Sequence, residues 1–129
     1  IEKQRKNRDL IWDQIKEFKN IKKRKTPENT FDTADALIFY VQNNEIAMKC
    51  REELLKINIS TKILPEAYTW HFAETWSHMP ELVSSHGGNL NKSFPKSRDL
   101  LKKCVSIPIF CKMNKSVPKK IKQSLENVI

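Results

Sequence analysis

Apolar residues at helical spacing mark the start of the chain. Residues 2–18, EKQRKNRDLIWDQIKEF, are mostly charged, yet four apolar residues recur on one helical face: Leu10, Ile11, Ile15 and Phe18. The positions before them are polar and carry no N-cap signal, so this helix begins as if cut from a longer one. A short extended piece is predicted next, at Ile21–Lys25.

The pattern changes to strands in the middle of the chain. Three elements are predicted there: a strand at Ala34–Val41, a helix at 43–58 and a second strand at 59–64. The first strand is a short apolar run that ends in β-branched and aromatic residues. Asn43 or Asn44 can cap the helix, and Asn58 tolerates the left-handed conformation that ends helices.

The C-terminal third repeats this alternation after a polar stretch. We predict four elements: a loop over 85–95, a helix over 96–105, a strand over 106–110 and a helix over 115–129. Pro108 lacks a backbone donor, so its strand is expected either to lie at a sheet edge or to have a free N–H side at this position. Ser116 is a suitable N-cap for the last helix, and Pro118 fits its first turn. The inner face of the preceding helix is expected to hold Leu100, Leu101 and Cys104.

This order of elements predicts a single α+β domain, which suits a chain of 129 residues. The expected architecture is a small, mostly antiparallel sheet of three to four strands with helices on one face. Nine residues are predicted to contribute to the core: Ala36, Ile38, Tyr40, Leu54, Ile63, Leu101, Ile107, Leu125 and Val128.

The chain is strongly basic, with a formal net charge of +9 at pH 7. Nineteen of its 24 cationic residues are Lys, and they are scattered along the sequence. Nucleic-acid sites usually concentrate cations on one face and use Arg for bidentate contacts. The densest run, KNIKKRK at Lys19–Lys25, is interpreted as a solvated helix end and loop. We therefore expect no specific nucleic-acid partner.

Cysteine use and hydropathy favour an intracellular protein. The three cysteines, Cys50, Cys104 and Cys111, cannot all pair, and their spacing matches no zinc pattern. Unpaired thiols are typical of a reducing compartment. No apolar run approaches the roughly 18 residues of a membrane span, and no signal peptide is visible. The sequence thus predicts a cytoplasmic protein with no membrane partner.

Aromatic residues and imidazoles gather in one segment, ILPEAYTWHFAETWSHMPEL, at Ile63–Leu82. They could form a core, a metal site or the wall of a ligand pocket. His71 and His78 are seven residues apart, so no convergent metal set is predicted. Gly87 and Gly88 form no phosphate-binding pattern, and the chain holds no complete catalytic constellation.

The ordered set of segments resembles a known family. A strand ALIFYV, a helix ending in LLKINI, a strand STKIL, a Pro-led aromatic segment and the ending CVSIPIFCKMNKSVPKKIKQSLENVI follow one another. This layout is similar to the C-terminal small domain of the DegT/DnrJ/EryC1/StrS family of sugar aminotransferases. Asn58 stands where that family usually has Gly, a mild departure because Asn also adopts left-handed conformations.

The resemblance implies a domain division and a cofactor. Residues 1–20 would be the end of the helix that links the two domains of the enzyme, and residues 21–129 its small domain. The full-length enzyme would use pyridoxal phosphate, form a homodimer and move an amine from a donor, expected to be glutamate, to a keto- or aldehydo-sugar, either a nucleotide sugar or a sugar acid for bacterial surface polysaccharide. The Schiff-base Lys of the family lies in the large domain. The chain, which begins at Ile1, is therefore expected to be an inactive piece that binds no cofactor itself.

The resemblance also places the aromatic segment beside the substrate. Tyr68, Trp70 and His71 are the candidate substrate-binding residues, because such rings combine an apolar face with a polar tip. Phe72 and Trp76 are expected to bury area in the core instead. The alternative from a different class is a stand-alone basic binding module for nucleic acid or protein.

Overall fold

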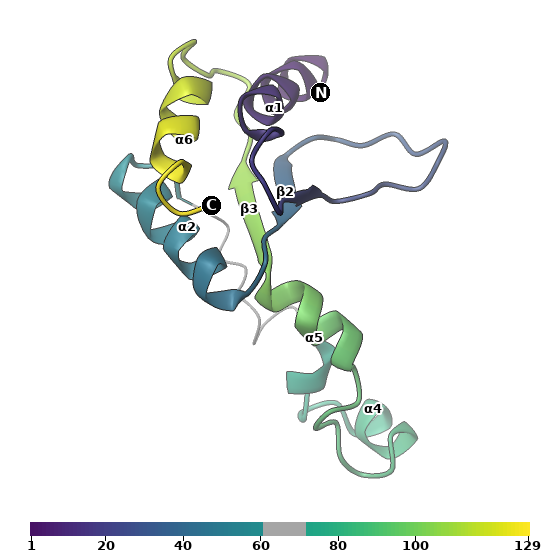
Figure 1. Cartoon of the computed structure of the whole chain (residues 1–129). Coiled ribbons are helices and arrows are strands. Elements are labelled where there is room, and N and C mark those ends of the chain that lie inside the picture. Colours follow the sequence, from purple (N-terminus) through teal and green to yellow (C-terminus); the bar gives the residue numbers. More distant parts are fainter. Residues whose placement is uncertain (61–71) are drawn as a thin grey trace.

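A computed structural model of the chain describes residues 1–60 and 72–129. In these ranges the elements follow in this order: α1 Glu2–Ile15, β1 Lys22–Lys23, β2 Ala36–Tyr40, α2 Asn44–Lys56, the 3-10 helix η1 Ala73–Thr75, α4 Pro80–Ser85, α5 Pro95–Lys102, β3 Cys104–Pro108 and α6 Val117–Leu125. Figure 1 shows α1, α2 and α6 around the sheet, with α4 and α5 beyond its end. The α+β class predicted from the sequence is confirmed.

The sheet is antiparallel and has the order β1-β2-β3. Lys22 lies opposite Tyr40, and Ala36 lies opposite Pro108. In the described ranges β3 pairs with β2 alone, so Pro108 sits in an edge strand, the first of the two predicted alternatives. The second strand expected at 59–64 is not established: Ile59 and Ser60 are in neither a helix nor a strand, and the rest lies outside the described residues.

Alternation along β2 corrects the predicted core. Leu37 and Phe39 are fully buried, whereas Ala36, Ile38 and Tyr40 are only half-buried. Successive side chains of a strand point to opposite faces, and the helices cover the face of Leu37 and Phe39. Both faces of this strand are apolar in sequence, so composition alone does not show which face the helices cover.

The helical core joins the two ends of the chain. Helix α6 packs against both α1 and α2, and together they cover one face of the sheet (Figure 1). Residues from all of these elements form one apolar cluster: Ile11, Ile15, Leu37, Phe39, Val41, Ala47, Cys50, Leu54, Val105, Ile107, Ile109, Ile121 and Leu125. Leu54, Ile107 and Leu125 are thus buried as predicted, Leu101 and Val128 are half-buried, and Ile63 lies outside the described residues.

Helix α2 begins and ends where the sequence predicts. The Asn43 side chain accepts a hydrogen bond from the Ile46 backbone N–H at 2.9 Å, the geometry of an N-cap. Asn58 follows the helix with a φ of 60°, the left-handed conformation expected for it.

Three details of the other helices differ from the sequence predictions. Leu10 in α1 is 46% exposed, because the buried face of that helix is set by Ile11 and Ile15. Helix α5 ends at Lys102, and Cys104 belongs to β3, where it pairs with Tyr40; the register with β2 overrides the helical pattern. Leu100, expected on the inner face of α5, is 52% exposed.

The last helix, α6, begins without a side-chain cap. Ser116 occupies the N-cap position, but its hydroxyl donates to the Asn114 side chain at 3.0 Å instead of capping the helix. In the portions of the chain that are described, no helix combines the length and the apolar character needed to cross a membrane.

Candidate functional site

A small lobe extends from the end of the sheet where Tyr40 pairs with Cys104. It contains η1, α4 and α5 together with the connection 86–94 (Figure 1). The chain enters this lobe at Phe72, directly after His71, the last of the three candidate substrate-binding residues. Of the parts of the molecule that the structure describes, the lobe is therefore the nearest in sequence to the three candidate residues.

The lobe has an apolar centre of its own. Phe72 is 2% exposed and meets Phe94 edge-on, with 6.3 Å between the ring centroids. Leu90 is also buried, and the His86 ring lies 5.0 Å from that of Phe94. Aromatic pairs of this geometry hold neighbouring segments together. The prediction that Phe72 buries area is confirmed, while Trp76 is half-buried.

Turn chemistry shapes the connection that follows α4. The N–H of Gly88 donates to the Val83 carbonyl at 2.9 Å, and Gly87 and Gly88 have φ values of 70° and 86°. This left-handed backbone suits glycine and ends the helix abruptly. Lys92 is also left-handed, with a φ of 66°, and its backbone N–H donates to the Glu74 carboxylate.

An ion pair between Glu74 and Arg98 joins the two ends of the lobe. Arg98 Nε donates to Glu74 Oε2 at 2.7 Å, and Arg98 Nη2 donates to Oε1, so the contact is bidentate. The Glu74 side chain is only 7% exposed and that of Arg98 is 20% exposed. Bidentate Arg–carboxylate pairs are among the more specific polar contacts in proteins. The pair fixes α5 against η1.

A hollow of ≈ 740 Å³ opens beside this ion pair. Its cations are Arg98, Lys92 and Lys102, against the single carboxylate of Glu74. Because Arg98 neutralises Glu74, the two lysines leave the hollow positive. Side-chain hydroxyls and amides complete the polar lining: Thr75, Ser77, Asn89 and Asn91. Such a lining suits a ligand that has hydroxyl groups and carries negative charge.

The charge state of Glu74 favours binding over catalysis. The hydrogen bond from Arg98 lowers the pKa of the Glu74 carboxyl, with a further contribution from the Lys92 N–H. A carboxylate with a lowered pKa and both oxygens engaged is a weak general base. The lining of the hollow can hold a ligand, but Glu74 supplies no strong base there.

The residues that line the hollow do not fit pyridoxal phosphate as a complete site. Lysines that form Schiff bases are usually desolvated, but Lys92 and Lys102 are both exposed. These two lysines therefore do not provide a Schiff-base position. Within residues 1–60 and 72–129, no cluster of three or more His, Cys, Asp or Glu could hold a metal ion.

The hollow includes part of the aromatic segment that the sequence singled out, but none of the three candidate substrate-binding residues. Tyr68, Trp70 and His71 lie outside the described residues, and His78 is exposed. The pairing of Glu74 with Arg98 was not predicted, because 24 residues separate them and no short-range spacing rule connects such positions. Glu74 stands within the aromatic segment, which is the only sequence signal that points to it.

No model of a known protein family matches the chain, and no curated protein matches it.

Proposed function

We propose that the chain is the small domain of a sugar aminotransferase that depends on pyridoxal phosphate, and that its lobe positions the sugar. The observation that carries the proposal is the positive, hydroxyl- and amide-lined hollow of ≈ 740 Å³ that the chain builds immediately after Tyr68, Trp70 and His71. The α+β fold and the order of segments, from ALIFYV to the C-terminal helix, add support.

In this proposal the chain's own residues bind and orient the substrate. The Glu74–Arg98 pair keeps η1 and α5 in place, while Lys92 and Lys102 attract the negative group of a nucleotide sugar or sugar acid. Tyr68, Trp70 and His71 contact the sugar ring and its hydroxyls. Chemistry then belongs to the cofactor and to a large domain that carries the Schiff-base lysine.

Glutamate is the proposed amino donor, and the full-length enzyme is proposed to be a homodimer. The thiols of Cys50, Cys104 and Cys111 are all unpaired, which supports a cytoplasmic location, where thiols stay reduced. The product sugar would serve bacterial surface polysaccharide.

The test requires the complete protein that contains this chain. Its gene should encode, upstream of Ile1, a large domain with a lysine-bearing cofactor motif. The purified protein should show a visible cofactor absorption band, and glutamate should convert that band. The 129-residue chain alone should retain no such band after addition of pyridoxal phosphate and desalting. A band retained by the chain alone would contradict the division of roles.

Substrate positioning is tested with His71→Ala in the complete protein, with His78→Ala, an exposed position, as the matched control. We expect His71→Ala to raise the KM for the sugar or lower its turnover roughly tenfold or more, while the half-reaction with glutamate is preserved. His78→Ala should leave both half-reactions unchanged. An equal loss in both half-reactions for His71→Ala would overturn its assignment to the sugar.

A further inference from the structure

The connection between β1 and β2 is an exposed loop that begins with two cations, Arg24 and Lys25, and carries the carboxylate of Glu28 further along. Residues 24–31 are all exposed to solvent, and Figure 1 shows this connection extending away from the sheet and from α2 and α6. Its first two residues, Arg24 and Lys25, are the last two of KNIKKRK, the densest cationic run of the chain. Residues 24–31 belong to no helix or strand, so contacts with neighbouring elements hold the loop in position.

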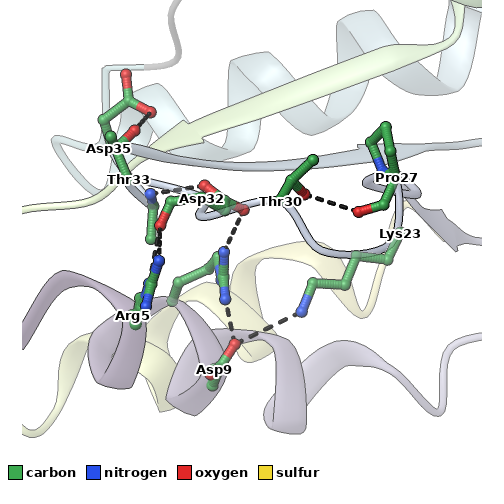
Figure 2. Close-up of polar contacts among 10 residues, drawn as sticks. Arg5, Asp9, Lys23, Pro27, Thr30, Asp32, Thr33 and Asp35 are labelled. Carbon is green, nitrogen blue, oxygen red and sulfur yellow. Dashed lines mark hydrogen bonds and ion pairs between the residues drawn. The ribbon is translucent and has the colours of Figure 1, made fainter. Parts of the chain in front are cut away.

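Two arginines of α1 anchor the loop at Asp32. Arg5 donates from Nε and Nη2 to the Asp32 backbone carbonyl at 2.8 and 2.6 Å. Arg8 donates from Nη1 to the Asp32 carboxylate at 2.5 Å, and the same carboxylate accepts from the Ala34 N–H at 2.7 Å. Figure 2 shows Asp32 held above α1 by these contacts. The far end of the loop is thus fixed.

The near end is fixed by the sheet. The N–H of Arg24 donates to the Ile38 carbonyl at 2.9 Å, which places Arg24 beside β2. Lys23 contacts Asp9 of α1 at 3.5 Å (Figure 2). Because both ends are held, the side chains between them belong to a closed loop and not to a free tail.

Arginine is concentrated here although the cations as a whole are scattered. Three of the five arginines of the chain line one hollow of ≈ 630 Å³, together with Lys23 and Lys25. Asp32 is the only carboxylate of that lining. Arg5 and Arg8 are committed to the anchor, but Arg24 and Lys25 form no ion pair within the described part of the chain. These two exposed cations remain available to an anion.

An exposed aromatic ring lies among these cations. Phe31 is 73% exposed, although a phenyl ring in water is unfavourable. The Arg5 guanidinium lies 3.6 Å from its centroid, a cation–π contact that orients the ring. A second hollow of ≈ 430 Å³ also includes Phe31, Arg24 and Lys25, so the three side chains are open on two adjoining sides.

We infer that this loop binds single-stranded nucleic acid without sequence preference, with a base stacked on Phe31 and backbone phosphates on Arg24 and Lys25. Stacking on an exposed ring beside cations that follow the backbone is how proteins hold unpaired strands. The Arg24 guanidinium can donate two hydrogen bonds to one phosphate. A duplex fits less well, because its bases are stacked on each other and cannot lie on Phe31.

The inferred site does not depend on the proposed aminotransferase function. It lies beside α1, Ala36 and the Ile38 carbonyl, whereas the lobe continues from the other end of β2, where Tyr40 pairs with Cys104. It also agrees with the expectation of no specific nucleic-acid partner, because phosphate contacts and stacking carry little sequence information.

The test measures fluorescence anisotropy of a labelled DNA strand of mixed sequence, about 12 nucleotides long, with the purified chain at roughly 50 mM salt. We expect the double variant Arg24→Gln/Lys25→Gln to bind at least about tenfold more weakly. It should also lower the slope of log affinity against log salt by roughly 1.4, which is two phosphate contacts at about 0.7 each. Phe31→Ala should weaken binding about tenfold without changing that slope.

The control variant Lys119→Gln/Lys120→Gln also removes two positive charges, but from the exposed surface of α6. It should weaken binding by less than about threefold. Equal losses in the two double variants would show general charge attraction and overturn the inference. So would an unchanged affinity for Phe31→Ala, or a mononucleotide that competes as strongly as the strand. All substituted side chains are exposed, and thermal unfolding checks that each variant folds.

Discussion

At the scale of single residues, burial gives the three cysteines different expected reactivities. Cys50 and Cys104 are 0% and 3% exposed, and burial raises the pKa of their thiols to about 12 and about 11. Cys111 is exposed. Only the thiolate form reacts, so Cys50 and Cys104 are protected both because reagents cannot reach them and because their thiols stay protonated.

A thiol-titration experiment follows from this difference. With an aromatic disulfide reagent at about pH 8, the folded chain should react quickly at one thiol, and in denaturant at three. Cys111→Ser should abolish the fast phase, whereas Cys50→Ser should leave it unchanged. Fast reaction of two or more thiols in the native protein would mean that the core opens more readily than its burial indicates.

At the scale of elements, helix α2 and strand β2 show where sequence reasoning succeeds and where it stops. The signals of α2 are local: Asn43 caps it and Asn58 ends it, and both could be predicted. Strand β2 could be predicted as a strand, but its inner face could not, because Leu37 and Ile38 are equally apolar. The covering helices decide that face, and two of them, α1 and α6, are distant from β2 in the sequence.

The cap of α2 can be tested by substitution. Asn43→Ala should lower the free energy of unfolding by about 1 kcal/mol, because the Ile46 N–H loses its acceptor. Urea unfolding measures the change. Asn44→Ala, one residue further and exposed, is the control and should change stability by less than about 0.5 kcal/mol. Equal effects at both positions would argue against side-chain capping.

The face assignment of β2 is tested by a matched pair of truncations. Leu37 is 0% exposed, so Leu37→Ala should cost about 2–5 kcal/mol of unfolding free energy through lost burial and a residual cavity. Ile38→Ala removes a side chain of the same size from the half-buried face and should cost clearly less. A larger loss for Ile38→Ala would reverse the assignment of inner and outer faces.

At the scale of the whole molecule, polar contacts join segments that no short sequence window connects. Arg8 reaches Asp32 across 24 residues, and Asn7 Nδ2 donates to the Phe110 carbonyl at 2.7 Å across 103 residues. Glu74 and Arg98 form the same kind of contact in the lobe. Periodicity and capping rules describe neighbours along the chain, so the α+β class could be predicted while these contacts could not.

The anchor at Asp32 makes stability depend on pH. The Ala34 N–H, followed by Arg8, lowers the pKa of the Asp32 carboxyl below its ordinary 3.8. A lowered folded-state pKa contributes stability that is present above the unfolded-state value and is lost as the pH falls through the folded-state value. Asp32→Asn should therefore cost about 1 kcal/mol at about pH 6, and the difference from wild type should shrink below pH 3.8.

Urea unfolding of both proteins at several pH values measures this difference. The asparagine can still accept from the Ala34 N–H, so the comparison isolates the charge. Asp13→Asn is the control: among the described residues the Asp13 carboxylate pairs with the exposed Lys16 alone, so this variant should show a much smaller dependence on pH. A constant difference between wild type and Asp32→Asn from about pH 6 to about pH 2 would contradict the electrostatic anchor.

The packing of α1 on α6 has a consequence for how the chain is made. Ile11 and Ile15 are synthesised well before Ile121 and Leu125, which share their apolar cluster but lie more than 100 residues further along the sequence. Until α6 leaves the ribosome, the apolar stripe of α1 has no complete partner in this domain and remains open to chaperones. Contacts of such sequence separation also slow folding in general. The nascent chain should therefore acquire protease resistance late, only once Leu125 has cleared the exit tunnel.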